Sequence, residues 1–209
     1  GYGQGAPALD FAWQLLRSLK RDKLEAVWER LSLEGASPGD LDLTSDGRQL
    51  LFSFGNTAHL ALDQDGGARS VWTQSRQGQI RLLRFLQRGK RRSVMIADET
   101  GEASLHDPAD GRLKHAFPLK GGSLAQVMMH DTVLTYLCRG GGFGQFNMAD
   151  GVGVFRDDLK SKPRVFAPWE RHKILMATST AFGILDLDRP GSKLQALRLG
   201  VEITKVPWF

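Results

Sequence analysis

Cysteine is almost absent from this chain, which has a single one, Cys138, in 209 residues. One cysteine cannot form a disulfide within the chain, and it excludes a zinc site built on Cys-x-x-Cys pairs. No window approaches the roughly 18 uncharged apolar residues that a membrane-spanning helix needs. At the N-terminus, no basic segment followed by an apolar run marks a signal peptide, so we expect a cytoplasmic protein.

Motifs of nucleophilic and metal-dependent enzymes are also missing. The five histidines form no H-x-x-x-H or H-E-x-x-H pair, and the serines in Ser45-Asp46-Gly47 and Gly191-Ser192 lack the G-x-S-x-G pattern. The glycine-rich run Arg139–Gly144 leads into a strand and turn pattern, which favours a hairpin over a phosphate-binding loop. The sequence therefore predicts no catalytic residue, no metal site and no cofactor, and we do not expect an enzyme.

What is present is the composition of a folded, mildly basic protein. Hydrophobic residues make up 41% and charged residues 24%, which is ordinary for a globular protein and argues against wholesale disorder. Lysine and arginine outnumber aspartate and glutamate by 28 to 23, giving a net charge of +5. That surplus favours acidic partners without identifying one.

The N-terminal segment has the pattern of a helix. Between residues 8 and 34, apolar side chains recur at helical spacing and good helix formers dominate. Gly35 and Pro38 end the pattern, so we expect residues 1–38 to form a helical arm, as one bent helix or two short ones. Its apolar stripe packs on the chain's own body or binds a partner protein; interspersed glutamates disfavour a membrane surface. The residues expected at a partner contact are Trp13, Leu16 and Trp28.

A four-fold repeat occupies the rest of the chain. Its units begin 43, 40 and 41 residues apart, at Leu51, Val94, Leu134 and Leu175. In each unit the second apolar strand ends at an aspartate or asparagine, and a glycine follows four or five residues later. The side-chain oxygen accepts backbone hydrogen bonds, and the glycine supplies the positive φ that reverses the chain. The expected structural turn residues are Asp63, Asp107, Asn147 and Asp186.

A further strand precedes each unit, at Leu41–Leu43, Ile80–Phe85, Leu124–Met128 and Arg164–Ala167. Four strands in about 40 residues are the dimensions of a β-propeller blade. The chain resembles the WD40 family, because an equivalent dipeptide stands in each unit where that family has Trp-Asp: Leu62-Asp63, His106-Asp107, Phe146-Asn147 and Leu185-Asp186. The stretch Leu43–Leu51 is similar to the family's S-x-D-G-x-x-L opening.

This resemblance implies a mainly β fold of about four propeller-like blades, each of four antiparallel strands, preceded by the N-terminal helical segment. The predicted domains are the helical arm, residues 1–38, and a WD40-like propeller, residues 39–209, that is partial or four-bladed. Val201–Phe209 has the pattern of one more strand. That strand either closes the ring within the chain, or the ring is completed by a second copy or a partner protein.

A basic patch lies between Ile80 and Arg92, where six cations occur without an acid. Its members are Arg81, Arg84, Arg88, Lys90, Arg91 and Arg92. Such a patch attracts an acidic protein surface or the phosphates of a nucleic acid, and the alternative is a solvated hairpin. Phe85 is the one aromatic side chain beside it, which disfavours stacking on single-stranded bases.

The resemblance implies a non-catalytic scaffold that mediates protein–protein interaction within a larger complex. A nucleic-acid- or ribonucleoprotein-associated subunit that uses the basic patch is the first alternative. An enzyme or a ligand-binding site at the propeller axis is the second, and it rests on fold analogy alone. The expected partners are other proteins, with nucleic acid or a second copy as alternatives.

Overall fold

The computed structural model describes residues 38–64, 67–88, 91–158, 163, 165–170, 173–178, 181–189 and 193–196. Within these ranges the chain consists of strands and the turns that join them. The strands form four antiparallel sheets, and in each sheet the strands pair in chain order as a meander. The described chain divides into two compact units, the first ending at Val127 and the second beginning at Met128.

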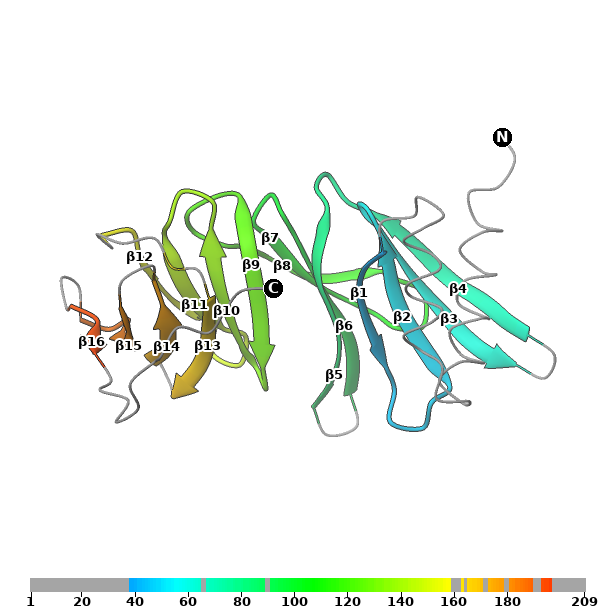
Figure 1. Ribbon diagram of the computed structural model, residues 1–209. Helices are drawn as coiled ribbons and strands as arrows, with labels where there is room; N and C mark the ends of the chain where they lie inside the picture. The colour runs from blue at the N-terminus through cyan, green and yellow to red at the C-terminus, as the bar shows by residue number, and fades with distance from the viewer. Residues whose placement is uncertain are drawn as a thin grey trace, which may run out of the picture. The chain divides into compact units, whose positions relative to one another are not determined.

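Unit 1 contains two sheets (Figure 1). Sheet 1 consists of β1 (Pro38–Leu43), β2 (Gln49–Phe54), β3 (Thr57–Gln64) and β4 (Gly67–Ser75). Sheet 2 consists of β5 (Ile80–Arg88), β6 (Arg91–Asp98), β7 (Glu102–His106) and β8 (Leu113–Pro118). The expected strands at Leu41–Leu43 and Ile80–Phe85 are therefore present, and both extend further than the sequence pattern indicates.

Unit 2 contains the other two sheets, and the first strand of sheet 3 begins just before the boundary between the units. Sheet 3 consists of β9 (Leu124–His130), β10 (Val133–Cys138), β11 (Phe143–Asn147) and β12 (Val152–Arg156). Sheet 4 consists of β13 (Val165–Glu170), β14 (Lys173–Ala177), β15 (Phe182–Asp186) and β16 (Gln195–Ala196). The glycine-rich run Arg139–Gly144 joins β10 to β11, where the Cys138 N–H donates to the Gly142 carbonyl at 2.8 Å.

The core of unit 1 lies between its two sheets. Leu51, Leu60 and Trp72 from sheet 1 pack with Leu83 and Ile96 from sheet 2, and all are buried. The middle strand β2 is buried at four successive positions and β6 at five, because both faces of these strands are covered. The edge strand β8, by contrast, is exposed at five of its six positions.

Two aspartates of β1 join the sheets of unit 1 at the edge of β5, which lies beside β1 in Figure 1. The Leu83 N–H donates to Asp40 Oδ2 at 2.8 Å, and the Phe85 N–H donates to Asp42 Oδ2 at 2.7 Å. Arg84 Nη1 also reaches Asp40 Oδ2, at 2.6 Å. The spacing of two residues matches on both strands, so the carboxylates satisfy edge N–H groups that would otherwise need water or another strand.

A buried ion pair ties the end of sheet 1 to sheet 2. Arg76, which follows β4, donates from Nε to Asp98 Oδ2 at 3.2 Å, and the Asp98 side chain is 1% exposed. The same guanidinium donates from Nη2 to Glu102 at 2.8 Å. The Thr100 N–H donates to the remaining oxygen of Asp98 at 2.9 Å, so the buried carboxylate is satisfied on both oxygens.

Aromatic packing joins the sheets of unit 2. Phe143 of β11 meets Phe166 of β13 edge to face, with ring centroids 4.7 Å apart. Ile174 and Leu185 pack in the same buried cluster. Arg156, at the end of β12, donates to the Asp186 carbonyl at 2.8 Å while Asp158 holds its other two nitrogens.

The predicted fold class is wrong. It combined an N-terminal helical segment with about four blades of a WD40-like propeller, whereas the described residues contain no helix and form no closed propeller. Their four sheets belong to two compact units. Strand and turn patterns act over a few residues, and ring closure depends on contacts between sheets that such patterns do not encode. The arm before Pro38 and the strand expected at Val201–Phe209 lie outside the described residues.

Candidate functional site

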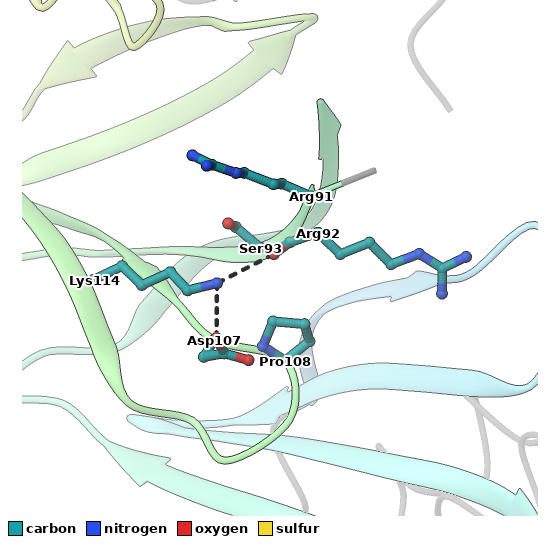
Figure 2. Close-up of a pocket in the computed structure, with 6 residues that line it drawn as sticks. All are labelled: Arg91, Arg92, Ser93, Asp107, Pro108 and Lys114. Carbon is teal, nitrogen blue, oxygen red and sulfur yellow. Dashed lines mark hydrogen bonds and ion pairs between the residues drawn. The ribbon is translucent and has the colours of Figure 1, made fainter. Parts of the chain in front are cut away.

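An open pocket of about 630 Å³ in unit 1 collects cationic side chains (Figure 2). It lies where the beginning of β6 meets the turn between β7 and β8 and the beginning of β8. Its lining residues are Arg91, Arg92, Ser93, Asp107, Pro108 and Lys114. Three of the six are cations and one is an acid, so the pocket is suited to an anionic group.

One of the three cations is already engaged by a carboxylate. Lys114 Nζ lies 2.9 Å from Asp107 Oδ2 and donates to the Arg92 carbonyl at 3.3 Å. Figure 2 shows both contacts converging on the ammonium group. The hydrogen bond from Lys114, followed by the one from the Ala109 N–H, holds the pKa of Asp107 below its usual value. Asp107 therefore stays ionised and neutralises Lys114.

The other two cations, Arg91 and Arg92, are exposed, and no side chain in the described part of the chain pairs with either. They extend from β6 in opposite directions, as Figure 2 shows, because successive side chains of a strand point to opposite faces. In the ladder with β5, Arg91 stands opposite Arg88 and Arg92 stands opposite Gln87. Two guanidinium groups therefore flank the pocket from the two faces of one strand.

Arg92 also extends the cationic region toward sheet 1. The pKa of Asp46, in the turn between β1 and β2, is lowered chiefly by the Thr44 hydroxyl and the Arg48 N–H that it accepts, and also by the positive charge of Arg92. This influence places Arg92 near the β1–β2 turn. Arg48 and Arg112 are exposed cations in turns at the same end of the sheets, so the positive charge is not confined to the pocket.

The basic patch expected from the sequence is only partly assembled. Arg81 is half-buried and pairs with Glu99 at 3.1 Å, and Arg84 pairs with Asp40 at 2.6 Å. These two arginines hold sheet contacts and do not reach the pocket. Lys90 and the side chain of Arg88 lie outside the described residues. Of the six cations, the structure brings Arg91 and Arg92 to the pocket.

Sequence reasoning missed Lys114, because it searched for runs of charge along the chain. Lys114 is separated from Arg92 by a strand and two turns, yet the meander brings both to the same end of sheet 2. A signal was present in the repeat itself, since the β5–β6 hairpin and the Asp107–Gly111 turn fall at the same end of an antiparallel meander. Residues next to those two turns therefore lie at the same end of the sheet.

The turn residues adopt closely similar hydrogen-bond patterns in sheets 2 and 3. The Ala109 N–H donates to Asp107 Oδ1 and the Ala149 N–H donates to Asn147 Oδ1, both at 2.9 Å. Gly111 and Gly151 close the two turns at φ of 74° and 73°. Asp186 accepts the Asp188 N–H at 3.0 Å in the same way. The side chain of Asp63 lies outside the description, although its backbone continues β3 in register with Ala68.

Sheet 1 holds the turn that forms one wall of the pocket. Trp72 Nε1 donates to the Pro108 carbonyl at 3.2 Å, and Gln74 Nε2 donates to the Gly111 carbonyl at 3.0 Å. Gly111 lies against the Trp72 ring, where an added Cβ would come within 3.0 Å of Cγ. The pocket wall is thus fixed by β4 as well as by its own sheet.

A Ser–His pair next to the pocket is structural. His106 Nδ1 lies 2.9 Å from the Gly111 carbonyl, so it donates there, and Nε2 accepts from the Ser104 hydroxyl at 2.9 Å. Both side chains are buried, which denies the hydroxyl to a substrate. Burial is the main cause that lowers the pKa of His106. Among the described residues, no cluster of His, Cys, Asp and Glu could hold a metal ion.

The contact expected at Trp13, Leu16 and Trp28 lies outside the described residues. In the part of the chain that the structure describes, no helix has the length and apolar character needed to cross a membrane.

The scan against protein-family models found no match for this chain, and neither did the search of curated proteins. The chain is similar to the crystal structure of Raptor from Chaetomium thermophilum, with 16% identity and a TM-score of 0.56. That match covers 75% of this chain and 16% of the Raptor chain, so this chain spans a small part of Raptor's length. It is also similar to the computationally designed Ika8 protein, with 8% identity and a TM-score of 0.56, over 73% of this chain and 46% of that one.

Identities this low show the fold alone, which is a β-rich repeat fold. In all, 851 solved chains match, so the fold is common and specifies no function by itself.

Proposed function

We propose that this chain is a non-catalytic interaction module that binds an acidic segment of a partner protein at the pocket between β6 and the β7–β8 turn. The observation that carries the proposal is the pair of exposed guanidinium groups, Arg91 and Arg92, that flank a pocket of about 630 Å³. Exposed arginines are well suited to bidentate recognition of carboxylates. As part of this proposal, the four repeat units are related to WD40 repeats. Proteins of that family mostly assemble complexes, which agrees with an interaction role.

The geometry favours an extended segment over a small anion. Arg91 and Arg92 point to opposite faces of β6, so one phosphate or carboxylate cannot be held by both guanidinium groups at once. An extended peptide with several acidic side chains can place one on each face. Because Lys114 is already paired with Asp107, the affinity of such a peptide depends mainly on the two arginines.

Chemistry at the pocket favours a protein over a nucleic acid. None of the six lining residues is aromatic, and single-stranded nucleic acids gain much of their affinity from bases stacked on aromatic side chains. Pro108 is the apolar surface that the lining offers, which suits the aliphatic part of a peptide. Nucleic acid is the alternative that the binding experiment must separate.

The direct test measures binding of a fluorescein-labelled oligoglutamate peptide by fluorescence anisotropy over a range of salt concentrations. The double variant Arg91→Ser/Arg92→Ser should bind about tenfold more weakly at low salt and show a flatter salt dependence. The matched control is Arg139→Ser/Arg189→Ser, which removes the same charge from exposed turns of unit 2. It should change the affinity less than about twofold.

Equal losses in the two double variants would mean that net charge alone drives binding, and the proposed site would be wrong. An oligouridylate of the same length serves as the second probe. If it binds more tightly than the peptide and loses affinity in the same Arg91 and Arg92 variant, the partner is a nucleic acid and the protein-binding proposal is wrong.

A further inference from the structure

Positions 107 and 147 allow a comparison of aspartate with asparagine in one turn geometry. Asp107 and Asn147 occupy equivalent places in sheets 2 and 3, and each accepts an N–H two residues later at 2.9 Å. The second bonds also agree, because the Gly111 and Gly151 N–H groups donate to the carbonyls of residues 107 and 147 at 2.9 Å. Asn147 thus demonstrates that an amide supports this turn, so the negative charge of Asp107 is not needed to fold it.

The charge of Asp107 has a second contact that the turn does not require. Its Oδ2 holds Lys114 Nζ at 2.9 Å, while Oδ1 accepts the Ala109 N–H. In the repeat of sheet 3, the strand after the turn carries Val152 and Val154 and has no cation before Arg156. The turn with the carboxylate at position 107 is thus followed by a lysine, and the turn with the amide at position 147 is not. Asp107 and Lys114 both line the pocket.

We propose that Asp107 is an internal competitor for the acidic ligand: it occupies Lys114, and thereby sets the affinity of the pocket and the number of acidic groups that a ligand must bring. This inference rests on the proposed function. A ligand with one carboxylate must displace Asp107 to reach Lys114, whereas a longer acidic segment binds first through Arg91 and Arg92. The pocket consequently discriminates against small monovalent anions.

Two properties of the pair make it displaceable. The Asp107 side chain is 27% exposed and the Lys114 side chain is 36% exposed, so solvent screens their attraction and the contact opens at little cost. Lys114 keeps its bond to the Arg92 carbonyl, which holds the ammonium at the pocket when Asp107 is removed. A cation released from Asp107 therefore remains in place for a ligand.

The test is Asp107→Asn, measured with the same labelled oligoglutamate peptide. Asparagine keeps the turn, as at position 147, and releases Lys114. We expect binding to tighten about threefold to fivefold at low salt, with a steeper salt dependence. The matched control is Asn147→Asp, the reverse exchange in the equivalent turn of unit 2, and it should leave the affinity unchanged.

Lys114→Gln completes the cycle. In the native background this substitution leaves the carboxylate of Asp107 unpaired at the pocket, so it should weaken binding about threefold to fivefold. In the Asp107→Asn background it should remove the whole gain. Acetate as a competitor should displace the labelled peptide more effectively from Asp107→Asn than from the native protein.

The outcomes separate this inference from the function on which it rests. If the native protein binds the peptide through Arg91 and Arg92 but Asp107→Asn binds no more tightly, the competitor role is wrong and the proposed function stands. If Lys114→Gln leaves the gain intact, the gain does not come from a released Lys114 and the inference is also wrong. If Asn147→Asp changes the affinity as much as Asp107→Asn does, the effect is one of net charge and the inference is wrong as well. If the native protein does not bind the peptide, the proposed function itself fails. Amide hydrogen exchange of residues 102–118 checks that the turn is retained in each variant.

Discussion

The two units are built from the same kind of four-stranded meander, yet their sheets are joined by different interactions. In unit 1, carboxylates of β1 accept N–H groups of β5, and Arg76 pairs with the buried Asp98. In unit 2, Phe143 and Phe166 pack together with aliphatic neighbours, and Arg156 bonds to one carbonyl of sheet 4. Both units thus have a buried apolar cluster between their sheets, and unit 1 adds the two carboxylates of β1 and a buried ion pair to it.

Equivalent turns of the two units also differ in what they present to solvent. After the turn in unit 1 come Arg112 and Lys114, and Lys114 lines one pocket with Arg91 and Arg92 of β6. After the turn in unit 2 come Val152 and Val154, and Val152 is 51% exposed. The turn residues that repeat along the chain therefore determine the backbone, and the residues beside them distinguish a cationic pocket from an apolar edge.

Removing the aromatic contact of unit 2 should have the largest effect on stability. Phe143 is fully buried, and Phe143→Ala deletes its contact with Phe166 and leaves a cavity. We expect the free energy of unfolding of unit 2 to fall by about 3–5 kcal/mol. Amide hydrogen exchange followed by segment should show faster exchange in β10–β15, with unit 1 unchanged. The control Val152→Ala, at an exposed position, should change stability by less than about 0.5 kcal/mol. Equal loss of protection in both units would show that they are not independent.

Breaking the buried ion pair of unit 1 should have the second largest effect on stability. Asp98→Ala leaves Arg76 buried with one exposed partner, Glu102, and we expect a loss of about 3 kcal/mol. Denaturant unfolding gives the magnitude, and segment-resolved exchange should place the loss in unit 1. Glu102→Gln is the matched control on the same arginine, because Glu102 is 47% exposed, and it should cost less than about 1 kcal/mol. A small effect of Asp98→Ala would mean that apolar packing holds both units in the same way.

Mild acid should produce the smallest effect, again in unit 1. Burial is the main cause that lowers the pKa of His106 and of His59 below the ordinary histidine value of about 6.5. The unfolded chain then binds protons more readily than the folded chain. The stability that comes from keeping these histidines neutral is therefore fully present above about pH 6.5, and it is lost as the pH falls toward their lowered folded-state pKa values. Amide hydrogen-exchange protection, compared between pH 7 and pH 5.5, should be lower in unit 1 at the acidic pH. The variant His106→Gln should show a smaller loss of protection. Unit 2, whose described histidine His130 is exposed, should change less.

Much of the local structure could be predicted from the sequence. Strands lie at all four repeats, and the turns at Asp107 and Asn147 use the side-chain acceptor and positive-φ glycine that the pattern indicates. These signals depend on hydrogen bonds and backbone conformations within a few residues, which is why one sequence is enough to see them. The prediction of a WD40-like propeller was wrong, because the arrangement of whole sheets does not follow from such local signals.

The candidate site shows the same division more sharply. Arg91 and Arg92 stood out as part of a run of charge, but so did Arg81 and Arg84, which the structure uses to pair with Glu99 and Asp40. Composition along the chain cannot separate a paired cation from one that faces solvent, since the partner carboxylate lies elsewhere in the sequence: Glu99 follows β6 of the same sheet, and Asp40 belongs to sheet 1. Asp40 and Asp42 stand two residues apart in β1, of which the sequence predicted only Leu41–Leu43, and their acceptor role needs the neighbouring edge of β5.

Strand positions, turn chemistry and the surplus of positive charge follow from the amino-acid sequence, because each is a property of neighbouring residues or of their sum. Which cations are neutralised, which remain exposed, and which come together at one pocket follow from the packing of sheets. Lys114 and Arg92 meet because an antiparallel meander returns the chain to the same end of the sheet, and Asp107 holds Lys114 because the turn places it there. Distances between residues remote in the chain are set by tertiary contacts, and the electrostatics of the pocket depends on those distances.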